Sequence, residues 1–313
     1  MRALVAGAGV IGQGWAARFA LNGWDVAIYD LDPLALKKTN VLIESVRELV
    51  SDAYGEMPAS GVVSQISELE GEYDWVQESL PEELSLKQDF FAAAAEIHSP
   101  VIASSTSGFK PSELATDEIA SRFLVCHPFN PVYLLPLVEI VPHAAAANVG
   151  GLVQSVSSVL EGLGMRPLLV KKEIDAHIAD RLLEAVWREA LWLVKDGVAT
   201  TADIDDAIIY GFGLRWAQMG LFETYRLAGG EAGMAHFLHQ FGPALQWPWS
   251  RLTDVPEMDA ALVEQIVEQS DEQSGAYSPD QLASIRDRNL VAILKALRST
   301  DWGAGAHLNR FDR

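Results

Sequence analysis

Three closely spaced glycines near the start of the chain are the residues that point most directly to a ligand. Gly7, Gly9 and Gly12 form G-x-G-x-x-G after the apolar run at residues 4–6 and before a helical pattern that ends at Gly23. In a strand–turn–helix, such glycines allow a tight turn, close approach of the backbone to a pyrophosphate, and close helix–strand packing. The pyrophosphate then lies at the helix N-terminus, where unpaired N–H groups and the helix dipole favour anions. We therefore expect a dinucleotide to bind at Gly7, Gly9, Val10, Ile11 and Gly12.

An acidic residue follows at the distance that a dinucleotide site requires. Asp30 ends the next apolar run, residues 26–29, and lies eighteen residues after Gly12. A carboxylate at this place accepts hydrogen bonds from the adenosine ribose and repels a 2′-phosphate. The cofactor expected is therefore NAD rather than NADP. An ordinary βαβ turn in which Asp30 only caps the backbone is the alternative.

A histidine and a hydroxyl-rich loop follow two further apolar runs. Residues 101–103 lead into Ser-Ser-Thr-Ser-Gly at 104–108, and residues 123–126 end at His127. In a doubly wound sheet, ligands bind outside the carboxyl ends of the strands, so we expect both segments at the cleft of the glycine turn. The unperturbed pKa of histidine, about 6.5, suits removal of a hydroxyl proton near neutral pH. A neighbouring carboxylate would fix the tautomer of such a base. These residue types fit the oxidation of a secondary alcohol by NAD.

The elements that position these residues predict an α/β fold. Further strands are expected at residues 74–78 and 168–170, and further helices at 85–96, 176–194 and 278–297, with a capping box at Thr200 and Asp203. A charged hinge is expected at 171–173, a solvated acidic helix face and loop at 40–74, and no regular element after Trp302. We predict a Rossmann-type doubly wound sheet in an NAD-binding domain at 1–173. An all-helical domain for substrate binding and dimerisation is expected at 174–313.

Composition narrows the class of partner. The chain has 313 residues and a net charge of −20, which argues against nucleic-acid binding and favours a cationic or zwitterionic small molecule over a polyanionic one. Cys126 is the only cysteine, so an internal disulfide and a multi-cysteine metal site are excluded. Because no apolar run has the length of a membrane span and residues 1–20 already form the first strand and helix, we expect no membrane segment, no signal peptide and a cytoplasmic location.

The motifs together resemble the 3-hydroxyacyl-CoA dehydrogenase superfamily over essentially the whole chain. The resemblance is carried by the glycine motif, by residues 104–107, by His127-Pro-Phe-Asn130-Pro, by Glu139, and by segments 203–205 and 219–223. It implies that His127 is the catalytic base and Glu139 its partner, and that Ser107 and Asn130 donate hydrogen bonds to the substrate oxygen. It also implies that Glu82 and Lys87 lie beside the nicotinamide half of NAD. The alternatives are a structural His127, a surface Glu139, and an exposed Glu82–Lys87 pair.

Two departures from the acyl-CoA enzymes disfavour CoA as part of the substrate. Those enzymes have Asn in a V-N-R-L segment where this chain has Asp180, and a lysine-rich helical insertion where this chain is acidic. Segments 211–225 and 241–249 resemble the branch of the superfamily that oxidises carnitine, a 3-hydroxy acid with a trimethylammonium group. This implies a cation site formed by a carboxylate and aromatic faces, because quaternary ammonium groups bind such faces. Candidates for the cation site are Asp180, Trp187 and Trp216, and candidates for the substrate carboxylate are Arg215 and Lys110.

The expected activity is therefore the NAD-dependent oxidation of that hydroxy acid by a homodimer. A dehydrogenase for another free 3-hydroxy acid, such as L-gulonate, or for a 3-hydroxyacyl-CoA is the nearest alternative. A non-catalytic, crystallin-like NAD-binding protein is the alternative from a different class. For the two tryptophans, a place in the core of an amphipathic helix remains the competing interpretation.

Overall fold

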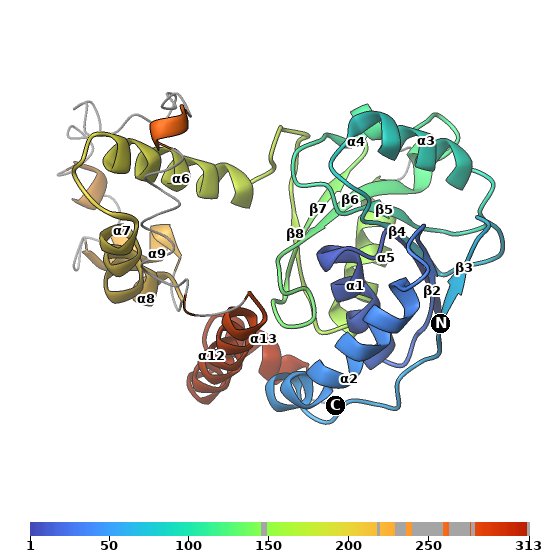
Figure 1. Ribbon diagram of the computed structural model, residues 1–313, viewed down its shortest axis with the longest axis horizontal. Helices are drawn as coiled ribbons and strands as arrows, with labels where there is room; N and C mark the ends of the chain where they lie inside the picture. The colour runs from blue at the N-terminus through green and yellow to red at the C-terminus, as the bar shows by residue number, and fades with distance from the viewer. Residues whose placement is uncertain are drawn as a thin grey trace. The chain divides into compact units, whose positions relative to one another are not determined.

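The computed structural model describes residues 1–144, 149–217, 220–228, 236–239, 259–262, 276 and 279–311. An eight-stranded sheet organises the N-terminal part of the chain (Figure 1). Its strand order is β3-β2-β1-β4-β5-β6-β7-β8, and neighbours run parallel except for the antiparallel pair β6–β7. This order confirms the predicted Rossmann-type sheet. The strands are β1 (Arg2–Ala6), β2 (Asp25–Tyr29), β3 (Val63–Ile66), β4 (Trp75–Glu78), β5 (Ile102–Ser104), β6 (Phe123–Pro128), β7 (Leu137–Pro142) and β8 (Arg166–Leu169).

The central strand β1 shows why the sheet is parallel and covered on both faces. Residues 3–6 of β1 are completely buried, as expected for an apolar run flanked by β2 and β4. Right-handed crossovers on either side of β1 place helices on opposite faces. Figure 1 shows α1 (Val10–Leu21) and α2 (Ala35–Tyr54) on one side, and α3 (Leu84–Ala94) and α4 (Pro111–Leu114) on the other. The carboxyl ends of β1, β4 and β5 consequently meet at one edge.

The helical part contains the predicted elements, with one shifted boundary. The helix expected from residue 176 begins at Ala179, because Ala176 and His177 have φ angles of 58° and 50° that no right-handed helix accepts. The capping box at Thr200 and Asp203 is confirmed. The remaining helices are α5 (Val149–Gly162), α6 (Ala179–Lys195), α7 (Thr201–Ala207), the π-helical turn η2 (Ile208–Phe212), α8 (Gly213–Trp216), α9 (Leu221–Ala228), α12 (Pro279–Thr300) and α13 (Ala304–Arg310), with the short turn η1 (Ala120–Arg122) before β6.

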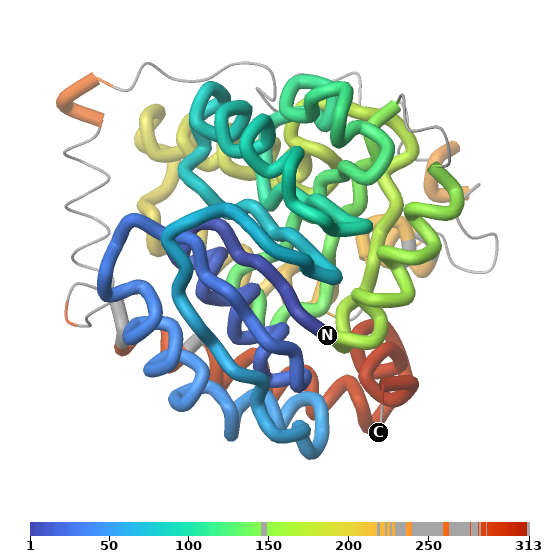
Figure 2. Tube along the Cα trace, turned by 90° about the vertical axis from the view of Figure 1, so that its right-hand side faces the viewer, coloured from blue at the N-terminus to red at the C-terminus, as the bar shows by residue number. Residues whose placement is uncertain are grey.

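Three elements differ from expectation. The acidic segment 40–74 contains β3 as well as a helix, the segment before residue 142 contains β7, and the tail after Trp302 contains α13. The α13 helix has no amphipathic repeat, but Leu308 is buried and His307 contacts the carbonyl of Gly164 at 3.1 Å. Figure 2 shows α13 beside the C-terminal end of α5. Long-range contacts, rather than local sequence, hold this helix.

The chain divides into two units, which we describe separately. Unit 1 comprises Met1–Asp180, Arg286–Asp301 and Gly305–Arg313, and unit 2 comprises Arg181–Ile285 and Trp302–Ala304. This division differs from the expected boundary between residues 173 and 174. The first residues of α6, and most residues of α12 and α13, belong to unit 1. The reason is packing, since Tyr133 donates to Asp287 at 2.5 Å and Arg298 donates to the carbonyl of Ala53 at 3.2 Å.

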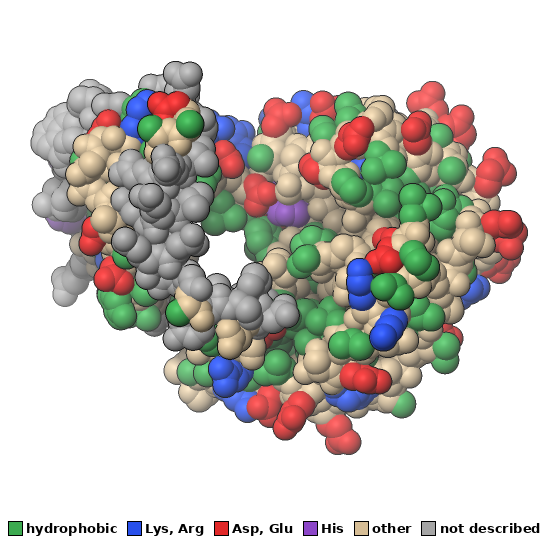
Figure 3. All heavy atoms as spheres, viewed as in Figure 1, with side chains coloured by type: hydrophobic (Ala, Val, Ile, Leu, Met, Phe, Trp, Pro, Cys, Tyr) green, Lys and Arg blue, Asp and Glu red, His purple; other side chains and the backbone are tan. Residues whose placement is uncertain are grey.

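The surface reflects the acidic composition. Figure 3 shows many more acidic than basic side chains on the visible face of unit 1. Within the described ranges, no helix combines the length and apolar character needed to cross a membrane.

Candidate active site

The glycine motif fits a pyrophosphate. Gly7 has a φ of +85°, and a Cβ added there would lie 2.5 Å from the carbonyl oxygen of Ser79. A Cβ on Gly12 would lie 1.8 Å from the carbonyl oxygen of Gly7, so helix and turn pack too closely for any side chain. At Gly9, by contrast, an added Cβ meets nothing within 4 Å. Two glycines therefore close the turn, and the third leaves its outer side open at the N-terminus of α1, where a phosphate would bind.

A cavity of about 690 Å³ extends from the glycine turn. Asp30 lies in its wall, where the Ala8 N–H donates to Oδ2 at 2.6 Å and the Asp32 N–H donates to Oδ1 at 2.7 Å. These two bonds fix the carboxylate in one orientation and leave each oxygen a further lone pair for a ribose hydroxyl. The lining residues are Gly7, Gly9, Val10, Ile11, Tyr29, Asp30, Leu31, Leu69, Ser79, Leu80, Pro81, Leu86, Asp89, Phe90 and Ala93.

A buried ionic network lies at the carboxyl ends of β4 and β5. Lys87 Nζ is 2.8 Å from Glu78 Oε1 and 3.1 Å from Glu82 Oε2, and the Lys87 side chain is 1% exposed, so it is not the surface residue of the alternative interpretation. Burial raises the pKa of Glu78, although Lys87 and Ser104 act in the opposite direction. Burial also acts to raise the pKa of Glu82, but the hydrogen bond from Thr106 and the charge of Lys87 outweigh it and lower that pKa. The network fixes the 104–108 loop against β4.

His127 and Glu139 form a cross-strand pair. They are directly opposite in the antiparallel register of β6 and β7, and His127 Nδ1 lies 2.9 Å from Glu139 Oε2. The other oxygen, Oε1, accepts the N–H groups of Ile178 and Ala179, both at 3.0 Å. Burial acts to raise the pKa of Glu139, but these hydrogen bonds and the charge of His127 lower it on balance. An ionised Glu139 accepts from Nδ1–H, which leaves the lone pair of Nε2 available to take up a proton.

Asp180 lies on the other side of the same imidazole. Its Oδ2 is 3.9 Å from His127 Nε2, and its side chain is 26% exposed. The ring of Phe129 packs against His127 with ring centres 4.8 Å apart. The imidazole is therefore held between Glu139 at Nδ1 and Asp180 near Nε2. The sequence predicted Asp180 at a substrate cation, which stays a prediction, and the structure places Asp180 beside the candidate base.

Sequence reasoning missed His177, which is fully buried with its ring centre 5.7 Å from that of His127. It also missed Glu78, whose signal was a carboxylate in a strand that is otherwise free of charge. No local signal marked His177, because it meets His127 only through the packing of the turn before α6.

The other expected site residues of unit 1 lie on loops. Ser107 is half-buried between Thr106 and Gly108, and Asn130 is exposed after β6, before the cis peptide bond to Pro131. Lys110 Nζ lies 3.0 Å from Asp175 Oδ1, and Asp175 raises the pKa of Lys110 by hydrogen bonding and by its charge. As a substrate-carboxylate ligand, Lys110 would have to share its charge with Asp175.

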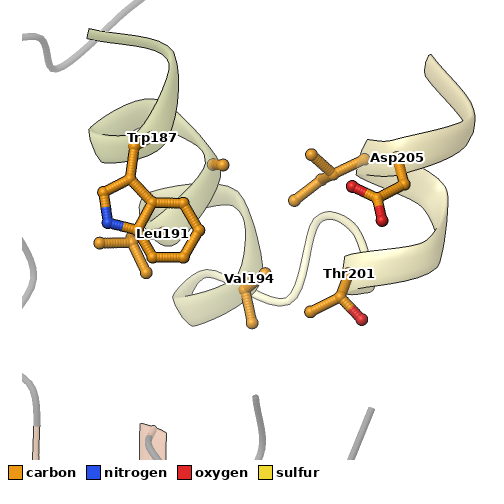
Figure 4. A pocket seen from close by; sticks show the side chains of 7 residues that line it. Trp187, Leu191, Val194, Thr201 and Asp205 are labelled. Carbon is orange, nitrogen blue, oxygen red and sulfur yellow. The ribbon is translucent and has the colours of Figure 1, made fainter. Parts of the chain in front are cut away.

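The remaining candidates lie in unit 2. Trp187 is 55% exposed and, with Leu191 and Val194 of α6, lines a small cavity of about 70 Å³ closed by Thr201 and Asp205 of α7 (Figure 4). Arg215 and Trp216 belong to α8, where the Trp216 ring lies 4.5 Å from that of Phe212. Since these residues belong to the other unit, their place at the substrate stays a prediction. Segment 241–249, which carried part of the resemblance, lies outside the described residues, as does Met219.

The chain is similar to known proteins over both of its parts. Residues 2–174 match the model of the 3-hydroxyacyl-CoA dehydrogenase NAD binding domain, and residues 177–269 match that of the C-terminal domain. A Ruegeria pomeroyi protein named L-carnitine dehydrogenase/betainyl-CoA thioesterase is 54% identical over 99% of this chain, which spans 65% of that relative's length. A Mesorhizobium japonicum protein named L-carnitine dehydrogenase is 47% identical over 97% of this chain and 86% of its own.

Among solved structures, an NAD+-dependent dismutase named 5-formyl-3-hydroxy-2-methylpyridine 4-carboxylic acid 5-dehydrogenase has a TM-score of 0.75 at 27% identity. The match covers 94% of this chain and 98% of that one. The predicted cofactor, NAD, is confirmed by the matched NAD binding domain. By its matches to both domain models and by the extent of its similarity to these relatives, the chain belongs to the 3-hydroxyacyl-CoA dehydrogenase family.

Proposed function

We propose that the protein oxidises L-carnitine to 3-dehydrocarnitine with NAD. The observation that carries this proposal is the similarity to relatives named L-carnitine dehydrogenase, such as the Mesorhizobium japonicum protein at 47% identity over 97% of this chain. The site supports it, because the candidate base His127 is flanked by the carboxylate of Asp180, which can also attract a cationic substrate. Asp180 provides a negative charge at the position where a trimethylammonium group would approach.

The site residues then have distinct tasks. Glu139 accepts from Nδ1–H and holds His127 in the tautomer whose Nε2 can take the hydroxyl proton. As that proton moves to Nε2, Glu139 and Asp180 stabilise the imidazolium from both sides. Ser107 and Asn130 donate hydrogen bonds to the substrate oxygen as its bond to carbon becomes double. NAD held at the glycine turn by Gly7, Gly9 and Gly12 would supply the acceptor for the hydride that leaves the same carbon.

The substrate's charged ends are assigned to different groups in this proposal. Asp180 attracts the trimethylammonium, with Trp187 and Trp216 offering aromatic faces, and Arg215 or Lys110 pairs with the carboxylate. The NAD contacts comprise the glycine turn, Asp30 at the ribose, and Glu82 at the nicotinamide half, where the buried Lys87 holds the Glu82 carboxylate.

A substrate panel read by NADH absorbance tests the proposal. The purified protein is supplied with NAD and with L-carnitine, D-carnitine, L-gulonate, 3-hydroxybutyrate or 3-hydroxybutyryl-CoA, and kcat/KM is compared. L-carnitine should exceed every other substrate. A higher kcat/KM for L-gulonate or the CoA ester would refute the substrate assignment, and an absence of turnover with every compound would favour an NAD-binding protein without catalysis.

We further propose a homodimer whose interface lies on unit 2. Exposed apolar side chains cluster on its helices, which is unusual for a surface that stays in water. The members are Leu182, Leu183, Val186, Ile209, Tyr210, Leu214 and Phe222. Light scattering after gel filtration tests the dimer, and a monomeric mass at micromolar concentration would contradict it. A cytoplasmic location is proposed on the single cysteine, which suits a reducing compartment.

A further inference from the structure

A second histidine lies beside the His127–Glu139 pair, and the reaction described above does not use it. His177 is fully buried, and its Nε2 lies 3.3 Å from the carbonyl oxygen of Thr106. Because a carbonyl oxygen only accepts, Nε2 must carry the hydrogen. The other nitrogen, Nδ1, is buried and has no hydrogen-bond partner in the described part of the chain. The ring therefore makes a single directed hydrogen bond, and that bond leads to the loop that contains Ser107.

The backbone around His177 is unfavourable for residues with a side chain. Ala176 and His177 both have φ angles in the left-handed region, 58° and 50°, which glycine adopts readily and other residues rarely do. Such a turn persists only where its surroundings hold it. Here the Ala176 N–H donates to the carbonyl of Gly108 at 3.2 Å, and the Ile178 N–H donates to Glu139 Oε1 at 3.0 Å. The strained turn therefore contacts both the 104–108 loop and the carboxylate behind His127.

We propose that His177 is a positioning residue that fixes the Ser107 loop relative to the His127–Glu139 pair. Ser107 lies between two anchored carbonyls, since the carbonyl of Thr106 accepts from His177 and that of Gly108 accepts from Ala176. The same turn then continues into the N–H groups that orient Glu139. A shift of the His177 ring therefore moves the Ser107 hydroxyl relative to the imidazole of His127. This inference rests on the proposed function, in which Ser107 contacts the substrate oxygen.

The charge state of His177 fits this role. Burial lowers its pKa, and this outweighs the opposite effects of the Thr106 carbonyl, of Glu139 on β7 and of Asp180 on α6, while His127 on β6 also acts to lower it. His177 consequently stays neutral while His127 cycles between its two forms. A neutral ring keeps one fixed donor, and it adds no second positive charge that would oppose protonation of His127.

Paired substitutions separate positioning from simple packing. In His177→Gln the amide nitrogen takes the place of Nε2 and still donates to Thr106, whereas His177→Leu removes the donor. We expect His177→Leu to lower kcat per NAD-binding site about 10- to 100-fold, since small misplacements cost this much. The KM for NAD should stay unchanged, and His177→Gln should recover most of the loss. His307→Leu is the matched control, because His307 makes the same kind of bond to the carbonyl of Gly164 at 3.1 Å. It should leave kcat within about twofold of the wild-type value.

Either of two kinetic results would overturn the inference. An unchanged kcat in folded His177→Leu would show that the ring only fills space, and so would equal losses in His177→Leu and His177→Gln. Nitrogen NMR of the wild-type protein with isotopically labelled histidine gives a readout that requires neither a substrate nor a variant. It should show His177 as the neutral Nε2–H tautomer at about pH 7, and an imidazolium or the Nδ1–H tautomer would refute the inference. If the wild-type protein oxidises nothing in the panel, the proposed function fails while the NMR result still decides the geometry.

Discussion

The carboxylate of Asp180 should act on the candidate base as well as on the substrate. Asp180→Asn removes its charge and keeps its size. Because Oδ2 lies 3.9 Å from His127 Nε2, Coulomb's law at an effective dielectric constant of 20 gives about 4 kcal/mol for attraction to the imidazolium. Solvent at this partly exposed side chain leaves a third to a half of that energy, about 1.5–2 kcal/mol, which corresponds to a kcat lower by roughly 10- to 30-fold.

A second effect of the same substitution should depend on the charge of the substrate. A trimethylammonium group about 5 Å from the carboxylate gains roughly 3 kcal/mol before screening, and the surviving part raises KM about tenfold when Asp180 is neutralised. An uncharged analogue, with a tert-butyl group in place of the trimethylammonium, lacks this attraction. Its KM should stay nearly constant.

The assay compares two enzymes with two substrates by steady-state kinetics. We expect kcat to fall for both substrates in Asp180→Asn, and KM to rise for L-carnitine alone. Asp52→Asn is the control, since it removes the same charge from a surface ion pair with Lys295 at 2.8 Å. An unchanged kcat would refute the stabilisation of His127 by Asp180. An equal rise in KM for both substrates would refute its place at the cation.

Further predictions concern the base, the cofactor and the two buried carboxylates. His127→Ala should bind NAD normally in a calorimetric titration while kcat falls about 10²- to 10⁴-fold, and near-normal turnover would move proton transfer to another group. Asp30→Ala should lower the ratio of kcat/KM for NAD to kcat/KM for NADP. An unchanged ratio would show that Asp30 only accepts hydrogen bonds from the Ala8 and Asp32 N–H groups. Because the pKa of Glu139 is lowered in the folded protein, its stabilising effect is present above about pH 4.3 and is lost as the pH falls through the folded pKa. Urea unfolding should show that the wild-type protein has a higher free energy of unfolding than Glu139→Gln, and that this difference is smaller at about pH 3 than at pH 7. A difference that does not change with pH would contradict this prediction. Lys87→Met should cost about 3–5 kcal/mol by leaving Glu78 buried without its cation, and adding Glu78→Gln should recover part of it.

Local sequence predicted the parts of the site that depend on backbone conformation. The sequence contains an apolar run before each of four features of the site. Residues 4–6 precede the glycine turn, residues 26–29 precede Asp30, residues 101–103 precede the 104–108 loop, and residues 123–126 precede His127. Such features are encoded within a few residues, because turn geometry and strand burial restrict which side chains fit.

The features that were not predicted depend on long-range pairing. Strand β7 breaks the parallel βα alternation on which the prediction relied, and its pairing with β6 is what brings Glu139 opposite His127. The left-handed turn at Ala176 and His177 carries no glycine, so it was predicted as helix. Asp180 was assigned to the substrate from its residue type, while its distance from His127 follows only from the packing of that turn against β7.

The return of α12 and α13 to unit 1 has a consequence for how this unit folds during synthesis. Tyr133, Ala53 and Gly164 contact residues 287, 298 and 307, which are translated after residues 181–285 of unit 2. The sheet strands can pair as they emerge, but the parts of unit 1 that contact α12 and α13 stay uncovered until those helices have been translated. A truncation before residue 286 would therefore remove the contacts of Asp287, Arg298 and His307 from the nucleotide-binding unit. Unit 1 therefore completes its folding only after residues 181–285 of unit 2 have been synthesised.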